Sequence, residues 1–180
     1  MNIYLIGYRC TGKTRVGKAL ARLLERDFVD TDAIAVAEAG MPIRDMVARN
    51  GWSFFRRLEQ RVLSGTIRRK NCVVATGGGV VLDPENVRLM RIAGQLVWLK
   101  ATPETIRRRM ADDQNTGAAR PSLSGAGALE EIEAVLAARK AHYRRAADFA
   151  VDTDDVDPQA LCRDIAAHLA GPGCLPRRKG

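Results

Sequence analysis

Residues 7–14 read GYRCTGKT, which fits the pattern G-x-x-x-x-G-K-[ST]. The stretch directly follows an apolar run, Ile3 to Ile6, and directly precedes a helical pattern that starts near Val16. A strand before and a helix after are the context in which this pattern forms a phosphate-binding loop. We therefore predict an enzyme that handles a nucleoside triphosphate. The alternative, a plain glycine turn with a solvated lysine, fits the flanking pattern less well.

The chemistry of such a loop assigns roles to its residues. Glycines at both ends let the backbone wrap closely around a phosphate. The backbone N–H groups then form an anion nest, and the following helix adds its positive N-terminal end. Lys13 is expected to reach the β- and γ-phosphates, and the Thr14 hydroxyl to bind Mg²⁺. The residues predicted to hold the nucleotide phosphates are Cys10, Thr11, Gly12, Lys13, Thr14 and Arg15.

The length of 180 residues suits one domain with a proper core. We predict a single domain over residues 1–170, with a lid at about 112–126 and a disordered tail at 171–180. No apolar stretch approaches the length of a membrane span, and the N-terminus runs straight into a strand, so we expect no membrane anchor and no signal peptide. The four cysteines lack zinc-site spacing, and scattered cysteines are typical of a cytoplasmic protein.

The net charge is +8, from 23 arginines and six lysines against 21 acidic residues. A basic chain can bind nucleic acid, or it can bind a small anion several times over, since arginine forks onto carboxylates and phosphates. Aromatic residues make up only 5% and do not interleave with the basic clusters. We therefore predict no nucleic-acid partner, and we expect most arginines to lie on solvated helix faces.

Strand-like runs alternate with helical runs along the chain. The strands are expected at residues 2–6, 28–29, 72–76, 95–99 and 149–151; the helices are expected at 15–25, 33–39, 42–48, 52–69, 86–92, 103–111, 128–146 and 158–169. This alternation predicts an α/β fold with three layers, in which helices cover both faces of a five-stranded parallel sheet. Ligands of such sheets bind at the carboxyl ends of the strands.

Two further loops follow predicted strands at that same edge. Asp30 and Asp32 flank a threonine, and alternation in an extended segment would aim both carboxylates the same way. A kinase needs one acid near Mg²⁺ and one near the attacking hydroxyl, although either aspartate could instead cap the next helix. Gly77, Gly78 and Gly79 weaken local structure unless the backbone must approach something closely, and a flexible turn is the alternative.

Arginines in three other places are candidates for anion binding. Arg56 shares a helix face with Glu59, which could hold its guanidinium for a bound carboxylate; a surface ion pair is equally consistent with the spacing. Arg120, next to Pro121 in the irregular segment 112–126, could close over the phosphates as a lid residue. Arg139 lies in a basic helix that, taken alone, reads as a solvated face.

Together, in this order, these motifs resemble the shikimate kinase family of P-loop kinases, over about residues 2–169. The resemblance rests on the phosphate loop, Asp30-Thr31-Asp32, FRRLE at 55–59, the glycine triplet, Arg120-Pro121 and the segment 139–143. It implies the P-loop NTPase fold and ATP- and Mg²⁺-dependent phosphorylation of the 3-hydroxyl of shikimate. This chain departs from the usual family loop at Arg9, Cys10, Thr11 and Arg15, and it has Ser122 after the lid proline.

The resemblance also implies residue roles. Asp32 would orient or deprotonate the attacking hydroxyl, and Lys13 and Arg120 would stabilise the transferring phosphoryl group. Thr14 would bind Mg²⁺ with support from Asp30. The substrate would be bound by Asp32, Arg56, Gly77, Gly78, Gly79 and Arg139, and the adenine side of ATP by Arg109 and Pro158.

Three other functions remain open from the sequence. A related kinase could act on another hydroxy acid such as gluconate. A non-catalytic nucleotide-binding protein would need neither a lid arginine nor paired aspartates, and a nucleic-acid-binding module would show steep salt dependence. We expect a monomer that acts on shikimate and ATP.

Overall fold

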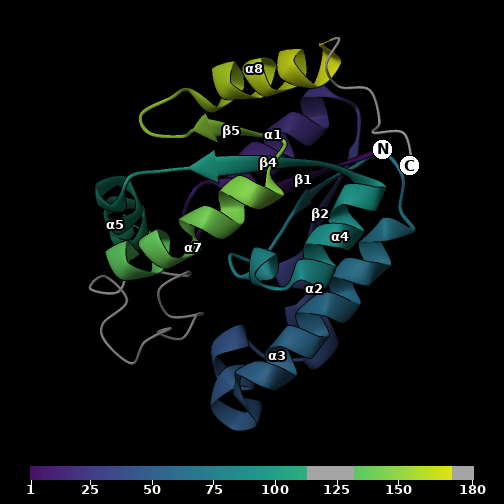
Figure 1. The fold of residues 1–180 in the computed structure, drawn as a ribbon, viewed down its shortest axis with the longest axis vertical. Coiled ribbons are helices and arrows are strands. Elements are labelled where there is room, and N and C mark those ends of the chain that lie inside the picture. The colour runs from purple at the N-terminus through teal and green to yellow at the C-terminus, as the bar shows by residue number, and fades with distance from the viewer. Residues whose placement is uncertain (113–131, 172–180) are drawn as a thin grey trace.

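The computed structural model describes residues 1–112 and 132–171. Five parallel strands form one sheet in the order β2-β3-β1-β4-β5 (Figure 1). The strands are β1 Asn2–Ile6, β2 Asp27–Asp30, β3 Cys72–Ala75, β4 Gly94–Lys100 and β5 Phe149–Asp152. The predicted strands lie within two residues of these bounds, so the predicted α/β class and the five-stranded parallel sheet are confirmed.

The central strand β1 is buried on both faces, as strands of a covered parallel sheet are. Ile3 and Leu5 join the apolar cluster formed with α1 and α8, while Tyr4 and Ile6 join the cluster formed with α3, α4 and α7. This alternation follows from the two-residue period of a strand. Figure 1 shows the resulting three layers, with α8 and α7 on different sides of the sheet.

The helices begin where the sequence supplies caps. The N-cap side chains of Asp30, Asp83 and Asp157 accept hydrogen bonds from backbone N–H groups of α2, α4 and α8. The helices are α1 Lys13–Leu23, α2 Thr31–Ala39, α3 Ile43–Ile67, α4 Pro84–Ala93, α5 Pro103–Asp112, α7 Ile132–Ala146 and α8 Pro158–Ala170, with a 3₁₀ turn, η1, at Val80–Leu82.

The two helices expected at 42–48 and 52–69 are directly joined as α3. Gly51 lies at the junction with φ 76° and ψ 169°, a backbone conformation outside the helical region. A residue with a Cβ rarely adopts this positive φ, so the glycine allows the bend without an intervening loop. The bend lets the first part of α3 pack on α2, where Ile43 and Met46 join Phe55 in a separate apolar cluster.

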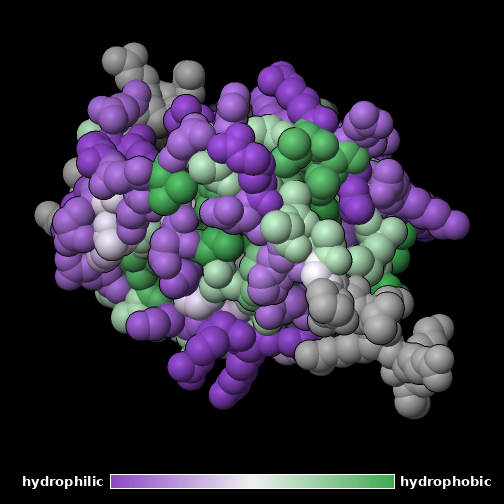
Figure 2. Space-filling view, turned by 90° about the horizontal axis from the view of Figure 1, so that it is seen from above, coloured by the Kyte–Doolittle hydropathy of each residue, from purple (hydrophilic) through white to green (hydrophobic). Residues whose placement is uncertain are grey.

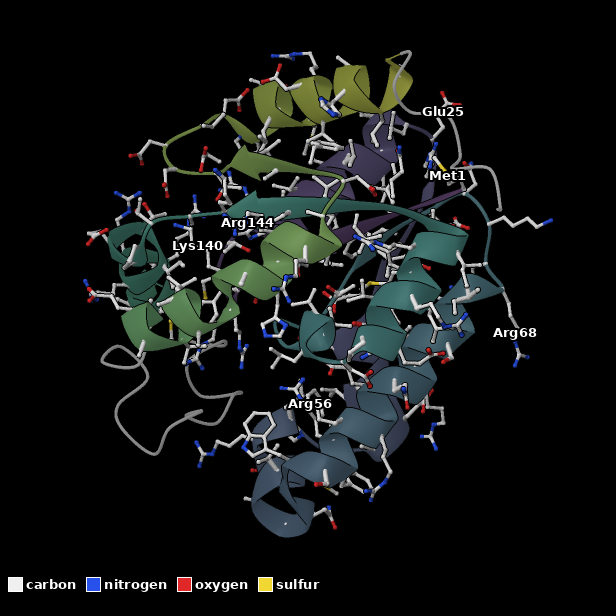
Figure 3. All side chains as sticks on the ribbon, viewed as in Figure 1. Met1, Glu25, Arg56, Arg68, Lys140 and Arg144 are labelled. Atoms are coloured by element: carbon white, nitrogen blue, oxygen red, sulfur yellow. The ribbon has the colours of Figure 1, made fainter. Side chains whose placement is uncertain are left out.

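The carboxyl ends of the strands meet at one edge of the sheet, where the phosphate loop follows β1 and the glycine triplet follows β3. Within residues 1–112 and 132–171, no helix is long and apolar enough to cross a membrane. Figure 2 shows one face of the molecule, on which hydrophobic side chains lie in small areas between hydrophilic ones. Most arginines of the described residues are exposed to solvent. Arg68 extends away from the protein in Figure 3, whereas Arg56 is only partly exposed.

Candidate active site

The phosphate loop makes a tight turn between β1 and α1. Gly7 has φ 140°, and a Cβ there would lie 2.4 Å from the Leu99 carbonyl oxygen of the neighbouring strand. Gly12 is left-handed with φ 91° and immediately precedes α1. The side chain of Lys13 folds back over the loop, where its ammonium donates to the carbonyls of Gly7 at 2.8 Å and Tyr8 at 2.6 Å. The loop therefore has the compact geometry that the motif predicts.

A larger cavity of about 360 Å³ opens over this loop. The predicted residues that line it are Cys10, Gly12, Lys13, Thr14, Arg15, Asp30, Asp32, Arg109 and Pro158. Arg109 reaches the loop from α5, because its guanidinium donates to the Cys10 carbonyl at 3.3 Å and to the Thr153 hydroxyl at 3.0 Å. The structure thus brings together residues that the sequence separates by more than a hundred positions. Thr11 is buried beside this cavity rather than lining it, and its hydroxyl donates to the Tyr8 carbonyl at 2.8 Å.

Asp30 performs two tasks at the end of β2. Its Oδ1 accepts from the backbone N–H groups of Asp32 and Ala33 and so caps α2, and its Oδ2 accepts from the Thr14 hydroxyl at 2.9 Å. The expectation that both aspartates lie in one extended segment was wrong, because Asp32 lies in the first turn of α2. Capping starts the helix at Thr31 and turns the backbone before Asp32. Both carboxylates nevertheless reach the larger cavity.

The pair of Thr14 and Asp30 fits Mg²⁺ in the nature of its donor atoms. Hard oxygen atoms are the ligands that Mg²⁺ prefers, and the ion commonly binds through one or two protein groups plus the phosphates of a nucleotide. Within the described residues, no group of three or more His, Cys, Asp and Glu side chains could hold a metal ion. A resident metal cage of such side chains is therefore absent from that part of the chain, while a nucleotide-bound ion is compatible with it.

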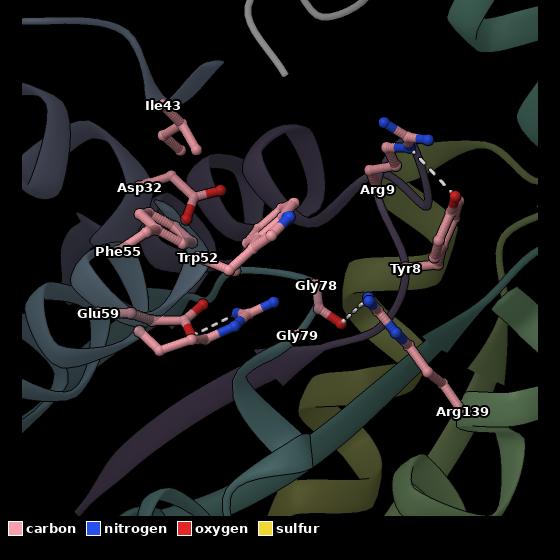
Figure 4. Close-up of a pocket in the computed structure, with 12 residues that line it drawn as sticks. Tyr8, Arg9, Asp32, Ile43, Trp52, Phe55, Glu59, Gly78, Gly79 and Arg139 are labelled. Atoms are coloured by element: carbon pink, nitrogen blue, oxygen red, sulfur yellow. Dashed lines mark hydrogen bonds and ion pairs between the residues drawn. The ribbon is translucent and has the colours of Figure 1, made fainter. Parts of the chain in front are cut away.

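A smaller cavity of about 50 Å³, drawn in Figure 4, adjoins the larger one, because Asp32 lines both. The predicted substrate residues that line it are Asp32, Arg56, Gly77, Gly78, Gly79 and Arg139. Ile43, Trp52 and Phe55 add an apolar wall. Basic groups, a carboxylate and an apolar wall around a small volume suit a small anion that carries hydroxyls on an apolar ring.

Arg56 and Glu59 form an ion pair in which Nη1 lies 2.6 Å from Oε2. Glu59 is only 3% exposed and Arg56 is 32% exposed, so the pair is partly buried, with Glu59 behind the guanidinium at the cavity wall. The Arg56 guanidinium also lies 5.2 Å from the centre of the Trp52 ring. Burial raises the pKa of the Glu59 carboxyl, and Arg56 opposes this increase. Glu59 therefore fixes Arg56 at the cavity wall at some electrostatic cost.

Side chains of the site lie against the glycine triplet, so a Cβ there would displace them. A Cβ on Gly77 would lie 2.4 Å from Glu59 Oε1, and one on Gly79 would lie 2.4 Å from a nitrogen of Arg56. A plain flexible turn would not show these close approaches. The Gly78 carbonyl accepts hydrogen bonds from Arg139, at 3.1 Å, and from the Tyr143 hydroxyl. Burial raises the pKa of Tyr143 to about 12, which keeps this hydroxyl protonated.

The sequence interpretation assigned no site role to several lining residues. Tyr8 and Arg9 occupy variable positions of the loop motif, so the motif carries no signal for them. Trp52 and Phe55 resemble ordinary core residues of a helix, and their place at a cavity depends on the bend at Gly51. Arg120 and nearly all of the predicted lid and tail lie outside the described residues.

A parallel sheet in this strand order, a phosphate loop after its central strand and a second cavity beside the loop define a P-loop kinase. Comparison with known proteins gives the family. The model of the family described as shikimate kinase matches residues 9–170. The chain therefore belongs to the shikimate kinase family, a family of phosphotransferases with ATP as co-substrate.

Individual relatives agree with this assignment. The shikimate kinase of Syntrophus aciditrophicus is 43% identical over 172 residues, which cover 91% of this chain and 88% of that protein. The structure of shikimate kinase from Acinetobacter baumannii in complex with shikimate has a TM-score of 0.86 and 32% identity, and the match covers 93% of this chain and 92% of that one. The structure from Bacteroides thetaiotaomicron has a TM-score of 0.83 and 27% identity, covering 94% and 98%.

Proposed function

We propose that this chain transfers the γ-phosphoryl group of ATP to the 3-hydroxyl of shikimate, giving shikimate 3-phosphate and ADP. Family membership supports the reaction class. The observation that carries the acceptor assignment is the smaller cavity, where Arg56 and Arg139 lie against the glycine triplet and Asp32 lies at the boundary with the larger cavity. Arginine forks bind a carboxylate with two parallel hydrogen bonds, which suits the single carboxylate of shikimate.

Asp32 is the group proposed to act on the acceptor hydroxyl. It is the only carboxylate of the described residues that lines both cavities. A carboxylate there can accept the hydroxyl proton as the oxygen attacks the γ-phosphorus. The same hydrogen bond to Asp32 would hold the attacking oxygen where the two cavities meet.

Lys13 and the backbone N–H groups of the loop are proposed to hold the phosphates of ATP. The Lys13 ammonium already lies over the loop, and stabilisation of charge on the phosphoryl group is the main task in this chemistry. Thr14, with Asp30 beside it, is proposed to hold Mg²⁺, which when bound would neutralise charge on the phosphates. Arg109 and Pro158 are proposed for the adenine side, and Arg120 for the phosphoryl group, from the family resemblance.

Further parts of the proposal concern the state of the protein. We propose a cytoplasmic monomer with no nucleic-acid partner. In support of a monomer, no helix of the described residues exposes more than one large apolar side chain; the exposed ones are Met1, Leu23, Val36, Phe54, Leu82, Ile92 and Val156. Light scattering at micromolar concentration would measure the mass directly.

The proposed reaction is tested with a coupled assay of ADP release that contains ATP, Mg²⁺ and one hydroxy acid at a time. Shikimate and gluconate are both included, because a related kinase for gluconate is the nearest alternative. We expect ADP release that depends on shikimate. Release that depends on gluconate and not on shikimate would contradict the acceptor assignment, and binding of ATP without release would indicate a non-catalytic protein.

A further inference from the structure

Of the described residues, two line both cavities. They are Asp32 and Arg9. If the donor phosphates lie in the larger cavity and the acceptor hydroxyl in the smaller, the transferred group must pass where the cavities meet. That boundary carries one anion, which the proposed function assigns to the hydroxyl, and one cation, which it leaves without a role. The inference about this cation rests on the proposed function.

Arg9 is not one of the solvated arginines of this chain. Its exposed fraction is 6%, and its Nε donates to the Tyr8 hydroxyl at 3.1 Å. Tyr8 is itself 1% exposed and packs with Ile106, Met110 and Ile132 from α5 and α7. A guanidinium with this degree of burial is costly to keep in place without compensating contacts. The side chain is therefore held by the core, and not by chance contacts in solvent.

The backbone of Arg9 is fixed as well. A Cβ on Gly78 would lie 3.3 Å from the Arg9 backbone nitrogen, which shows that the phosphate loop and the glycine triplet touch at this point. Arg9 therefore lies between the two loops that form the donor and acceptor sides. In Figure 4, Arg9 and Asp32 approach the pocket from different elements.

We propose that Arg9 is a further catalytic residue, whose guanidinium binds the phosphoryl group as it crosses from ATP to the acceptor. In this step the acceptor oxygen forms a bond to the γ-phosphorus. The bond from that phosphorus to the β–γ bridging oxygen breaks, its electron pair leaves with ADP, and the hydroxyl proton passes to Asp32. Arginine suits this place because its donors match phosphoryl oxygens in a planar fork. Tyr8 is a positioning residue that holds the fork at the boundary.

The competing account is that Arg9 only supports the fold by its bond to Tyr8. The two accounts differ in their dependence on phosphate. A residue that binds the transferred group contributes to the affinity for shikimate 3-phosphate and not to that for shikimate. A residue that only supports the fold affects both ligands in the same direction.

The experiment compares the dissociation constants of shikimate and shikimate 3-phosphate, by calorimetry, in wild-type protein, Arg9→Ala and Arg9→Gln. We expect the phosphate ester to bind about tenfold more weakly to both variants, as for loss of a charge-assisted hydrogen bond, with shikimate affinity within about twofold of wild type. The turnover number should fall by about tenfold or more. Arg22→Ala is the matched control, because Arg22 is an exposed arginine at the far end of α1. It should leave all three quantities unchanged.

An unchanged ratio of the two affinities in Arg9→Gln would overturn the inference, and so would equal weakening of both ligands. Arg9→Gln keeps the side-chain stem and an N–H donor near the position of Nε, which contacts Tyr8, so it answers the question even where Arg9→Ala fails to fold. Wild-type protein that released no ADP with shikimate would overturn the proposed function and this inference with it. Wild-type turnover with unaffected Arg9 variants would overturn the inference alone.

Discussion

The larger cavity is proposed to take its phosphate-binding groups from one short stretch, residues 7–14, whereas the smaller cavity combines Tyr8 and Arg9 of that stretch with α2, α3, the glycine triplet and α7. The loop uses backbone groups and a helix end, which any sequence with the right glycines can supply. The smaller cavity uses side chains from several elements, such as Arg139 of α7, which donates to the Gly78 carbonyl. Nucleotide binding in this fold is thus a local property, and acceptor recognition is a property of the tertiary structure.

The largest effect is expected from the larger cavity. Lys13→Ala removes the cation that lies over the loop, and we expect turnover to fall by about a thousandfold or more, because this charge acts on the transferring group. Calorimetry should find shikimate binding unchanged, since Lys13 does not line the smaller cavity. Turnover near that of wild type would show that Lys13 does not stabilise the transferring phosphoryl group.

Asp32 tests the boundary between the cavities. Asp32→Asn retains the shape of the side chain and removes its ability to accept the hydroxyl proton, so we expect turnover to fall by about a hundredfold. The dissociation constant of ATP should change little, and binding with a nucleotide analogue measures it. A loss of ATP affinity with no change in turnover would indicate that Asp32 helps to bind the nucleotide and does not act on the acceptor hydroxyl.

Arg56 tests the side-chain character of the smaller cavity, and its neighbour Arg57 provides a matched control. Arg56→Ala should raise the KM for shikimate by about tenfold or more, with a smaller change in the KM for ATP. It should also lower the melting temperature, because Glu59 would keep a buried charge without its ion-pair partner. Arg57 is exposed on the same helix, so Arg57→Ala should alter neither. Equal effects of the two substitutions would contradict the clamp.

The smallest effect concerns the pH dependence of stability. Burial raises the pKa of Glu59 above its ordinary value of 4.5, so between pH 4.5 and the raised pKa the folded state holds a proton that the unfolded state releases. Stability from this group is present below pH 4.5 and is lost as pH rises through the raised pKa. Glu59→Gln cannot ionise, so its melting temperature minus that of wild type should rise as the pH increases above 4.5. A difference in melting temperature between Glu59→Gln and wild type that stays constant with pH would show that the pKa of Glu59 is not raised by folding.

Sequence reasoning succeeded where the signal is local. The alternation of apolar and helical runs predicted the parallel sheet, and the loop motif predicted the turn between β1 and α1. It was wrong about the extended backbone at Asp32, because Asp30 caps α2 and Asp32 lies in the first turn of that helix. Spacing did not show whether the ion pair of Arg56 and Glu59 lies on the surface. The 3% exposure of Glu59 shows that its side of the pair is buried. Burial depends on what packs from distant segments, which spacing does not reveal.

Arg9 shows the same limit more strongly. In the motif it occupies a position where many residue types are compatible with the loop. Its significance comes from Tyr8, which anchors it to α5 and α7, and from Gly78, which the loop touches. None of these contacts follows from the order of residues in the loop.

The smaller cavity is proposed to select shikimate over other hydroxy acids and to present its 3-hydroxyl to ATP. The most direct test is a single reaction that contains ATP, Mg²⁺ and equal amounts of shikimate and gluconate, followed by ³¹P nuclear magnetic resonance. We predict one new phosphate ester, on the 3-oxygen of shikimate. An ester on gluconate, or on another oxygen of shikimate, would contradict the account.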